Sequence, residues 1–166
     1  SNVLKIEVVS KNWEDINYLR EHDVLVSGIT DWKAVDRLPI GEKLQTTTYL
    51  DGLGRPVQKV SAGTANPSQP GGQWGDGVQF YQYDTYGREA QKFQPYTTTN
   101  QPGRFKTDPA SDQSTYYADP AAYNETYPYS GLTYENSPLA RVLNTKKPGT
   151  SWAAGPGESV LYTLND

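Results

Sequence analysis

Cysteine is absent from the 166 residues, which excludes disulfide bonds, thiolate nucleophiles and cysteine-based metal sites. Methionine is absent too, and the chain contains one histidine, His22. A Ser-His-Asp system or a histidine-rich metal site needs more than this, so His22 is interpreted as an ordinary loop or surface residue. No apolar run approaches the roughly 20 residues that a membrane-spanning helix requires.

Positive charge is scarce as well. The net charge is −4 and the isoelectric point is near 5.0. Such a surface repels phosphate backbones, so nucleic acid is not expected as a partner. The glycine pairs of the chain lack the context of a phosphate-binding loop or a dinucleotide fingerprint, so no cofactor is expected.

Tyrosine, glycine and proline are abundant by contrast. The chain contains 13 Tyr and 4 Trp against 3 Phe, together with 15 Gly and 12 Pro. Tyrosine suits strands that are apolar on one side and wet at the tip, and glycine and proline mark frequent turns. Because the mean hydropathy is low, at −0.76, the aromatic side chains must supply much of the core.

Alternating apolar and polar residues predict a mainly β fold with antiparallel hairpins stacked into a twisted sheet and joined by long irregular loops. The strands are expected within residues 5–10, 13–26, 44–49, 78–83, 141–144 and 159–164. Segment 13–26 also has partly helical spacing, but strand is favoured. One short helix is expected near residues 31–38, capped by Thr30 or Asp31 and ended by Pro39.

The chain is expected to divide at residue 45. Residues 1–45 would hold N-terminal strands and the short helix, and residues 46–166 a β region that packs with them as one compact unit. Residues 61–77 offer almost nothing to bury except Trp74, so they are expected to form a mobile loop. The polar segment 94–119 is interpreted as mostly irregular.

An internal repeat is the most informative motif. The segment 51–55 (DGLGR) recurs as 84–88 (DTYGR), 33 positions later, and each copy is followed by Gln-Lys at the same spacing. The aspartate should accept hydrogen bonds from the backbone N–H groups two and three residues on, and the glycine should adopt positive φ. The arginine should start the next strand and lie on a neighbouring tyrosine. Each copy is therefore expected to form a strand–turn–strand hairpin through Asp51, Gly54, Arg55, Asp84, Gly87 and Arg88.

These residues resemble the YD repeat of Rhs proteins, in which Tyr-Asp is followed by two residues and Gly-Arg. Segment 83–88 (YDTYGR) fits this pattern, whereas Leu50 takes the place of the tyrosine in the first copy. Other segments occur in a similar order in an uncharacterised domain on the N-terminal side of the repeats in bacterial Rhs repeat-associated proteins, and the resemblance covers roughly residues 17–162. These segments are 17–18 (NY), 28–31 (GITD), 37–39 (RLP), 105–108 (FKTD), 137–143 (SPLARVL) and 160–162 (VLY).

The resemblance implies a context for the chain. Rhs repeats wind into a β-sheet shell that encloses a C-terminal toxin in several relatives, and such proteins are exported or displayed on the bacterial surface. The expected function is therefore that of a non-catalytic structural or interaction module, secreted or at the cell surface, whose main partner is the remainder of its own chain.

Two other functions compete with this one. A carbohydrate-binding surface module would use exposed aromatic side chains, with Trp74, Tyr127 and Tyr129 as the candidates, and its partner would be a surface glycan. A hydrolase is a remote alternative, because Asp51 and Asp84 fit turn positions better than a glycosidase pair. The acidic residues near 108–119 lack the spacing of a calcium loop, so no metal is expected.

Overall fold

Two antiparallel sheets form the core of the computed structural model, which describes residues 4–9, 16–65 and 73–162. The sheets and three short helices confirm the mainly β fold. The chain forms two compact units: Ser1–Phe80 with Pro95–Pro109, and Tyr81–Gln94 with Ala110–Asp166. Each unit therefore takes residues from two separate stretches of the chain, a division that differs from the one expected at residue 45.

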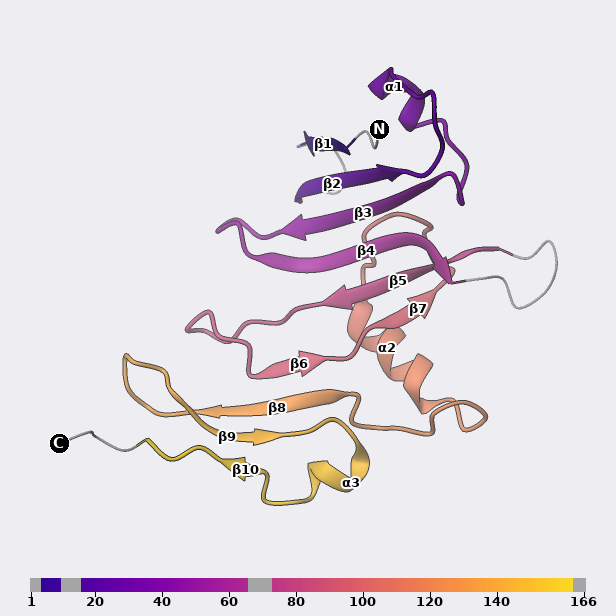
Figure 1. The fold of residues 1–166 in the computed structure, drawn as a ribbon. Coiled ribbons are helices and arrows are strands. Elements are labelled where there is room, and N and C mark those ends of the chain that lie inside the picture. Colours follow the sequence, from indigo (N-terminus) through magenta and orange to yellow (C-terminus); the bar gives the residue numbers. More distant parts are fainter. Residues whose placement is uncertain (1–3, 10–15, 66–72, 163–166) are drawn as a thin grey trace. The chain divides into compact units, whose positions relative to one another are not determined.

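The first unit contains a six-stranded sheet with the order β1-β2-β3-β4-β5-β7, in which every neighbouring pair is antiparallel (Figure 1). Its strands are β1 (Leu4–Val9), β2 (Asn17–Val24), β3 (Lys43–Leu50), β4 (Pro56–Ala65), β5 (Gly75–Phe80) and β7 (Tyr96–Thr98). The strands predicted within residues 5–10, 13–26 and 44–49 are present as β1, β2 and β3, although residue 10 and residues 13–15 lie outside the described residues. The strand predicted at 78–83 begins earlier and ends at Phe80.

Aromatic and β-branched side chains fill the core of this unit, as the composition predicts. Tyr49 is 1% exposed, and its ring centroid lies 5.7 Å from that of Tyr18 and 5.1 Å from that of Phe105. Val60 in β4 and Phe80 in β5 are buried as well. Alternate positions of the strands point inward, because successive side chains of a strand face opposite sides.

His22 is buried, which overturns its interpretation as a loop or surface residue. It lies within β2 and is 1% exposed, with Nε2 3.7 Å from Oδ1 of Asp36. His22 and Val24 share the inward face of this strand. The alternation of the segment carried a signal for this, because His22 is in phase with Val24 and Val26.

The short helix α1 (Trp32–Val35) begins as expected and ends earlier. Asp31 is the N-cap, and its Oδ1 accepts a hydrogen bond from the Lys33 N–H at 3.0 Å. Lys43 Nζ donates to the Val35 carbonyl at 2.9 Å and to the Asp36 carbonyl at 3.0 Å. A side chain from β3 therefore satisfies the carbonyl groups that a longer helix would have bonded internally.

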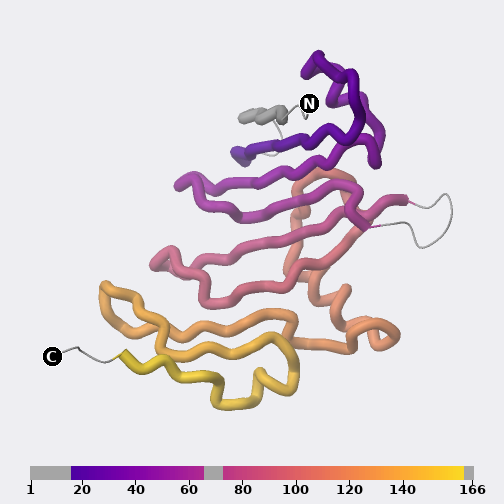
Figure 2. Tube along the Cα trace, in the orientation of Figure 1, coloured from indigo at the N-terminus to yellow at the C-terminus, as the bar shows by residue number. Residues whose placement is uncertain are grey.

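The second unit contains a four-stranded antiparallel sheet with the order β10-β9-β8-β6. Figure 2 follows the path of the chain through it, coloured by residue number. Its elements are β6 (Gln91–Phe93), α2 (Pro109–Ala118, of which Pro109 belongs to the first unit), β8 (Tyr129–Tyr134), β9 (Val142–Lys146), α3 (Thr150–Ala153) and β10 (Glu158–Ser159).

Two loop predictions were wrong in part. Helix α2 and strand β7 replace much of the irregular structure expected in segment 94–119. Within α2, Gln113 is the one buried residue, and its side-chain amide donates to the carbonyls of Gln94 and Pro128. A helix held by a polar side chain has no apolar period to detect. Strands occupy both ends of the loop expected at residues 61–77, since β4 continues to Ala65 and β5 begins at Gly75. Residues 66–72 lie outside the described residues.

Replacement of Tyr49 by alanine tests this account of the first core. Tyr49→Ala removes a buried ring that packs between two others, and we expect a loss of about 3–5 kcal/mol in the free energy of unfolding. Leu53→Ala is the control, because Leu53 is 79% exposed, and it should cost less than about 0.5 kcal/mol. Urea denaturation followed by tryptophan fluorescence measures both values, and equal losses would contradict the assignment of the core.

Candidate functional site

The first acid-to-arginine segment folds into a turn in which one carboxylate makes most of the bonds. Asp51 Oδ1 accepts hydrogen bonds from the backbone N–H groups of Leu53 and Arg55, each at 2.9 Å. Asp51 Oδ2 accepts from Arg55 Nε at 2.8 Å and lies 2.7 Å from Arg55 Nη2. The main chain closes the turn through bonds from the Asp51 N–H to the Arg55 carbonyl and from the Gly54 N–H to the Asp51 carbonyl.

The second segment repeats this arrangement bond for bond. Asp84 Oδ1 accepts from the N–H groups of Tyr86 and Arg88, each at 2.9 Å. Asp84 Oδ2 accepts from Arg88 Nε at 2.8 Å and lies 2.8 Å from Nη2. The same two main-chain bonds close the turn. The glycines match as well, with φ of +79° at Gly54 and +78° at Gly87. We call these two segments the arginine-locked turns.

The bond pattern differs in one respect from the pattern expected. Each aspartate accepts from the N–H groups two and four residues on, rather than two and three, because the glycine N–H is taken by the aspartate's own carbonyl. The pKa of Asp51 and that of Asp84 are both lower than the ordinary value, mainly because each carboxylate accepts a hydrogen bond from the backbone N–H of its arginine. Both side chains therefore act as structural acceptors.

The first turn connects the two strands of a hairpin, whereas the second turn does not. The first turn connects β3 to β4, which pair with each other, as predicted. The second turn lies between β5 and β6, but β5 pairs with β4 and β7, and β6 pairs with β8. The second predicted hairpin is therefore wrong: the turn is local, but the strands on its two sides belong to different sheets.

Arg88 also contacts two aromatic rings. Its Cζ atom lies 4.8 Å from the ring centroid of Tyr86 and 4.7 Å from that of Tyr134. The guanidinium thus binds the Asp84 carboxylate and also lies over two tyrosine rings, a combination that arginine suits better than lysine.

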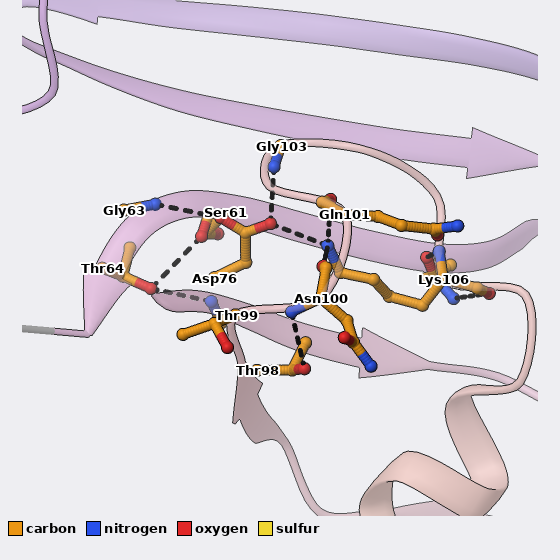
Figure 3. A network of polar contacts seen from close by, with 12 residues as sticks. Ser61, Gly63, Thr64, Asp76, Thr98, Thr99, Asn100, Gln101, Gly103 and Lys106 are labelled. Carbon is orange, nitrogen blue, oxygen red and sulfur yellow. Dashed lines mark hydrogen bonds and ion pairs between the residues drawn. The ribbon is translucent and has the colours of Figure 1, made fainter. Parts of the chain in front are cut away.

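A buried ion pair forms a second polar centre, in the first unit (Figure 3). Lys106 Nζ lies 2.8 Å from Asp76 Oδ2, and the two side chains are 1% and 2% exposed. Lys106 Nζ also donates to the carbonyls of Asn100 and Gln101, at 2.7 and 2.6 Å. All three N–H directions of the ammonium group are thereby used, which compensates in part for its removal from water.

The other groups around this ion pair fasten a loop to the sheet. Asp76 accepts from the N–H groups of Gly63 in β4 and of Gly103 in the loop, at 3.2 and 2.6 Å. The buried amide of Gln58 bonds with both backbone groups of Lys106, accepting at 2.7 Å and donating at 3.1 Å. The loop that follows β7 is therefore held against β4 and β5 by polar contacts.

Sequence reasoning missed this centre. Lys106 and Asp76 are 30 positions apart and belong to no motif of the repeat. One signal was available: Asp76 is in phase with Val78 and Phe80, which are buried, so its carboxylate had to face the core. Nothing in the sequence indicates which cation would neutralise it.

The three aromatic candidates do not form one set. Trp74 belongs to the first unit and is 37% exposed. Tyr127 and Tyr129 belong to the second unit, where their rings meet edge to face with centroids 6.0 Å apart. These two tyrosines line a hollow of about 180 Å³ together with Lys146 and Lys147.

No cluster of three or more His, Asp or Glu side chains that could hold a metal ion occurs among the described residues. Asp112 lies in α2, so the acidic residues of segment 108–119 do not form a single loop. Over the same residues, no helix is both long and apolar enough to cross a membrane.

The fold and these sites define the chain as a mainly antiparallel β domain whose polar side chains serve its own turns and loops. Residues 24–165 match the family described as a domain of unknown function, DUF6443, and the chain belongs to this family. No curated protein and no solved structure matches the chain.

Two glycines of the first turn provide a matched test of its backbone. Gly54 has positive φ, whereas Gly52 does not, and a Cβ atom at either position would meet nothing within 4 Å. Gly54→Ala should therefore cost about 1–2 kcal/mol of stability through backbone strain alone, and Gly52→Ala should be close to neutral. Thermal unfolding compares the two, and a neutral Gly54→Ala would contradict the turn geometry.

Loss of the buried cation is expected to be more damaging than loss of a surface cation. Lys106→Met leaves the Asp76 carboxylate buried without its ammonium partner, so we expect a loss of about 3–5 kcal/mol. Lys59→Met in β4 is the control, because Lys59 is exposed and should cost less than about 0.5 kcal/mol. Urea unfolding measures both, and a Lys106→Met variant as stable as the control would show that the ion pair is dispensable.

Proposed function

We propose that this domain is a non-catalytic structural module of an exported or surface-displayed bacterial protein of the Rhs type. In this role it builds a β-sheet platform and leads the chain into the repeats that follow. The remainder of its own chain is then its main partner. The proposal rests on the resemblance of its sequence to the domain that precedes YD repeats.

The observation that carries the proposal is the equivalence of the two arginine-locked turns. Asp51 and Asp84 accept the same hydrogen bonds from equivalent positions. In each turn the arginine side chain, Arg55 or Arg88, donates to the aspartate carboxylate. A unit that is repeated with its internal bonds intact is typical of chains that build sheets from recurring supersecondary units.

The state of the carboxylates supports a role without catalysis. The carboxylates of Asp51 and Asp84 each form an ion pair with an arginine, and the carboxylate of Asp76 forms one with a lysine. A general acid or base needs a carboxyl group that can exchange a proton with a substrate. We accordingly expect no activity in a panel of glycosidase, esterase and peptidase substrates.

Protease treatment of intact bacteria tests the location and the structural role together. Cells that express the full-length protein should release peptides of this domain on exposure to trypsin, without lysis. The Asp84→Ala variant, which loses the second turn, should reach the surface in reduced amount or be degraded. The Asp31→Ala variant, which loses only a helix cap, serves as the control. A wild-type protein that trypsin reaches only after lysis, or a robust hydrolase activity abolished by one carboxylate substitution, would refute the proposal.

A second candidate function is the binding of a surface glycan by the second unit. It is favoured by Tyr127 and Tyr129, which line one hollow together with two lysines. Trp152, 51% exposed, lines a neighbouring hollow of about 240 Å³ that shares Lys146 and Lys147 with the first. Aromatic faces with polar groups at their rim suit sugar rings.

A glycan array tests this second candidate. Wild-type protein should bind at least one class of glycan, Tyr127→Ala should lose that binding, and Trp74→Ala should keep it, because Trp74 belongs to the other unit. An array on which the wild-type protein binds nothing removes this function.

A further inference from the structure

A third segment closes on itself through an acid and an arginine. The N–H of Glu135 donates to the Arg141 carbonyl at 2.9 Å, as the aspartate N–H does in each arginine-locked turn. Glu135 Oε2 accepts from Arg141 Nε at 3.0 Å and lies 2.9 Å from Nη2. Glu135 Oε1 accepts from the Arg141 backbone N–H at 3.4 Å. Hydrogen bonds from Arg141 and Ser137 lower the pKa of Glu135 to about 2.

The backbone of this segment also follows the earlier turns. Ala140, the residue before the arginine, has φ of +49°, the left-handed region that Gly54 and Gly87 occupy. The β8–β9 hairpin changes register between Thr133 and Tyr134, immediately before the acid. The β3–β4 hairpin changes register immediately before its acid too, at Leu50.

Two additional residues are accommodated inside the turn. The Ala140 N–H donates to the Ser137 carbonyl, replacing the bond from glycine to aspartate in the shorter turns. The Ser137 hydroxyl donates to Glu135 Oε1 and accepts from the Leu139 N–H. Glutamate is one methylene longer than aspartate, so its carboxylate reaches across the wider turn to the arginine that ends it.

Each of the two later arginines contacts a tyrosine further along the chain: Tyr134 at the end of β8, or Tyr162, three residues after β10. Arg88 Cζ lies 4.7 Å from the ring centroid of Tyr134, and the Tyr134 hydroxyl donates to the carbonyl of Glu89 at 2.8 Å. The Leu132 N–H donates to the Ala90 carbonyl at 2.9 Å. The acceptors follow the arginine by one and two residues.

The same three contacts recur after the third turn. Arg141 Cζ lies 4.9 Å from the ring centroid of Tyr162, and the Tyr162 hydroxyl donates to the carbonyl of Val142 at 3.1 Å. The Val160 N–H donates to the Leu143 carbonyl at 2.9 Å. Again the acceptors follow the arginine by one and two residues. We call this set of contacts the Arg–Tyr joint.

We infer that residues 135–141 are a third copy of the arginine-locked turn, and that the arginines of the second and third turns each select an antiparallel segment that ends in a tyrosine as their partner. The inference deepens the proposed function, on which it rests, by naming what each turn binds. In this arrangement the acid holds the arginine in place, and the arginine with the carbonyl after it recognises the ring and hydroxyl of the tyrosine.

The joint fixes the register of the strands that it connects. Gln91 pairs with Gly131 in the first case and Asn144 with Ser159 in the second. In both pairs, the first residue stands three positions after the arginine and the second stands three positions before the tyrosine. A slip of one residue would turn every side chain to the opposite face and would break all three contacts at once. The joint therefore specifies which strand follows and at what register.

An exchange of turns tests the equivalence of the third copy. Residues 135–141 (ENSPLAR) are replaced by the sequence DGLGR of the first turn, which removes two residues. If the two turns are equivalent, the chain keeps a single cooperative melting transition within about 3 °C of the wild type. Replacement of residues 135–141 by the scrambled sequence GRDLG is the control and should lower the melting temperature. Loss of the transition with DGLGR overturns the equivalence.

The single substitution Ala140→Gly tests the same point without a change of length. Glycine relieves the positive φ, so the melting temperature should rise by about 2 °C. Ala154→Gly is the control, since Ala154 has φ of −79°, and it should lower the melting temperature. A fall for Ala140→Gly equal to that of the control counts against the third copy.

A double-mutant cycle tests the joint. Arg141→Gln and Tyr162→Leu are made singly and together, and the shifts in melting temperature are compared. Coupled residues should give a combined shift smaller than the sum of the single shifts, by about 3 °C. The cycle of Arg141→Gln with Tyr127→Leu is the control and should be additive. Additive shifts for Arg141 and Tyr162 overturn the joint. These measurements use the isolated chain, so they stand or fall independently of where the full-length protein is found in the cell.

Discussion

A carboxylate that accepts hydrogen bonds from its own turn and from the arginine that ends the turn is the interaction on which the arginine-locked turns depend. It requires an acid at the first position, positive φ before the arginine, and an arginine whose Nε and Nη2 both reach one oxygen of the carboxylate. The bonds that Asp51 and Asp84 make are all within five residues, so the turn does not need a particular strand pairing around it. This locality explains why the same turn joins a hairpin in one place and links strands of two different sheets in another.

The first unit adds a constraint of the opposite kind. The ion pair of Asp76 and Lys106 is buried and joins groups that are far apart in the sequence. Such a pair contributes little net stability compared with apolar side chains, because both charges lose their hydration. Its effect is instead to fix the conformation of the loop after β7, because the carbonyls of Asn100 and Gln101 both accept from the Lys106 ammonium group. The turns thus define local shape, and the buried pair defines one long-range attachment.

Arginine links the local turns to longer-range order in the second unit. Arg88 and Arg141 each bind an acid within the turn and a tyrosine beyond it. These contacts give Tyr134 and Tyr162 a specific structural role. The ring offers an aromatic face to the guanidinium, as phenylalanine would, but only the tyrosine hydroxyl can also donate to the neighbouring carbonyl.

What could be predicted from the sequence was whatever depends on neighbours in the chain: the mainly β fold, the Asp31 helix cap, the strand that contains Tyr49, and the turns at Gly54 and Gly87. Helix α2 escaped detection because Gln113, a polar residue, attaches it. The pairing of Asp76 with Lys106 and the separation of β5 from β6 were decided by tertiary structure. Each of these depends on groups that meet only when distant strands pair, and no periodicity or local motif records which distant partner a strand will find.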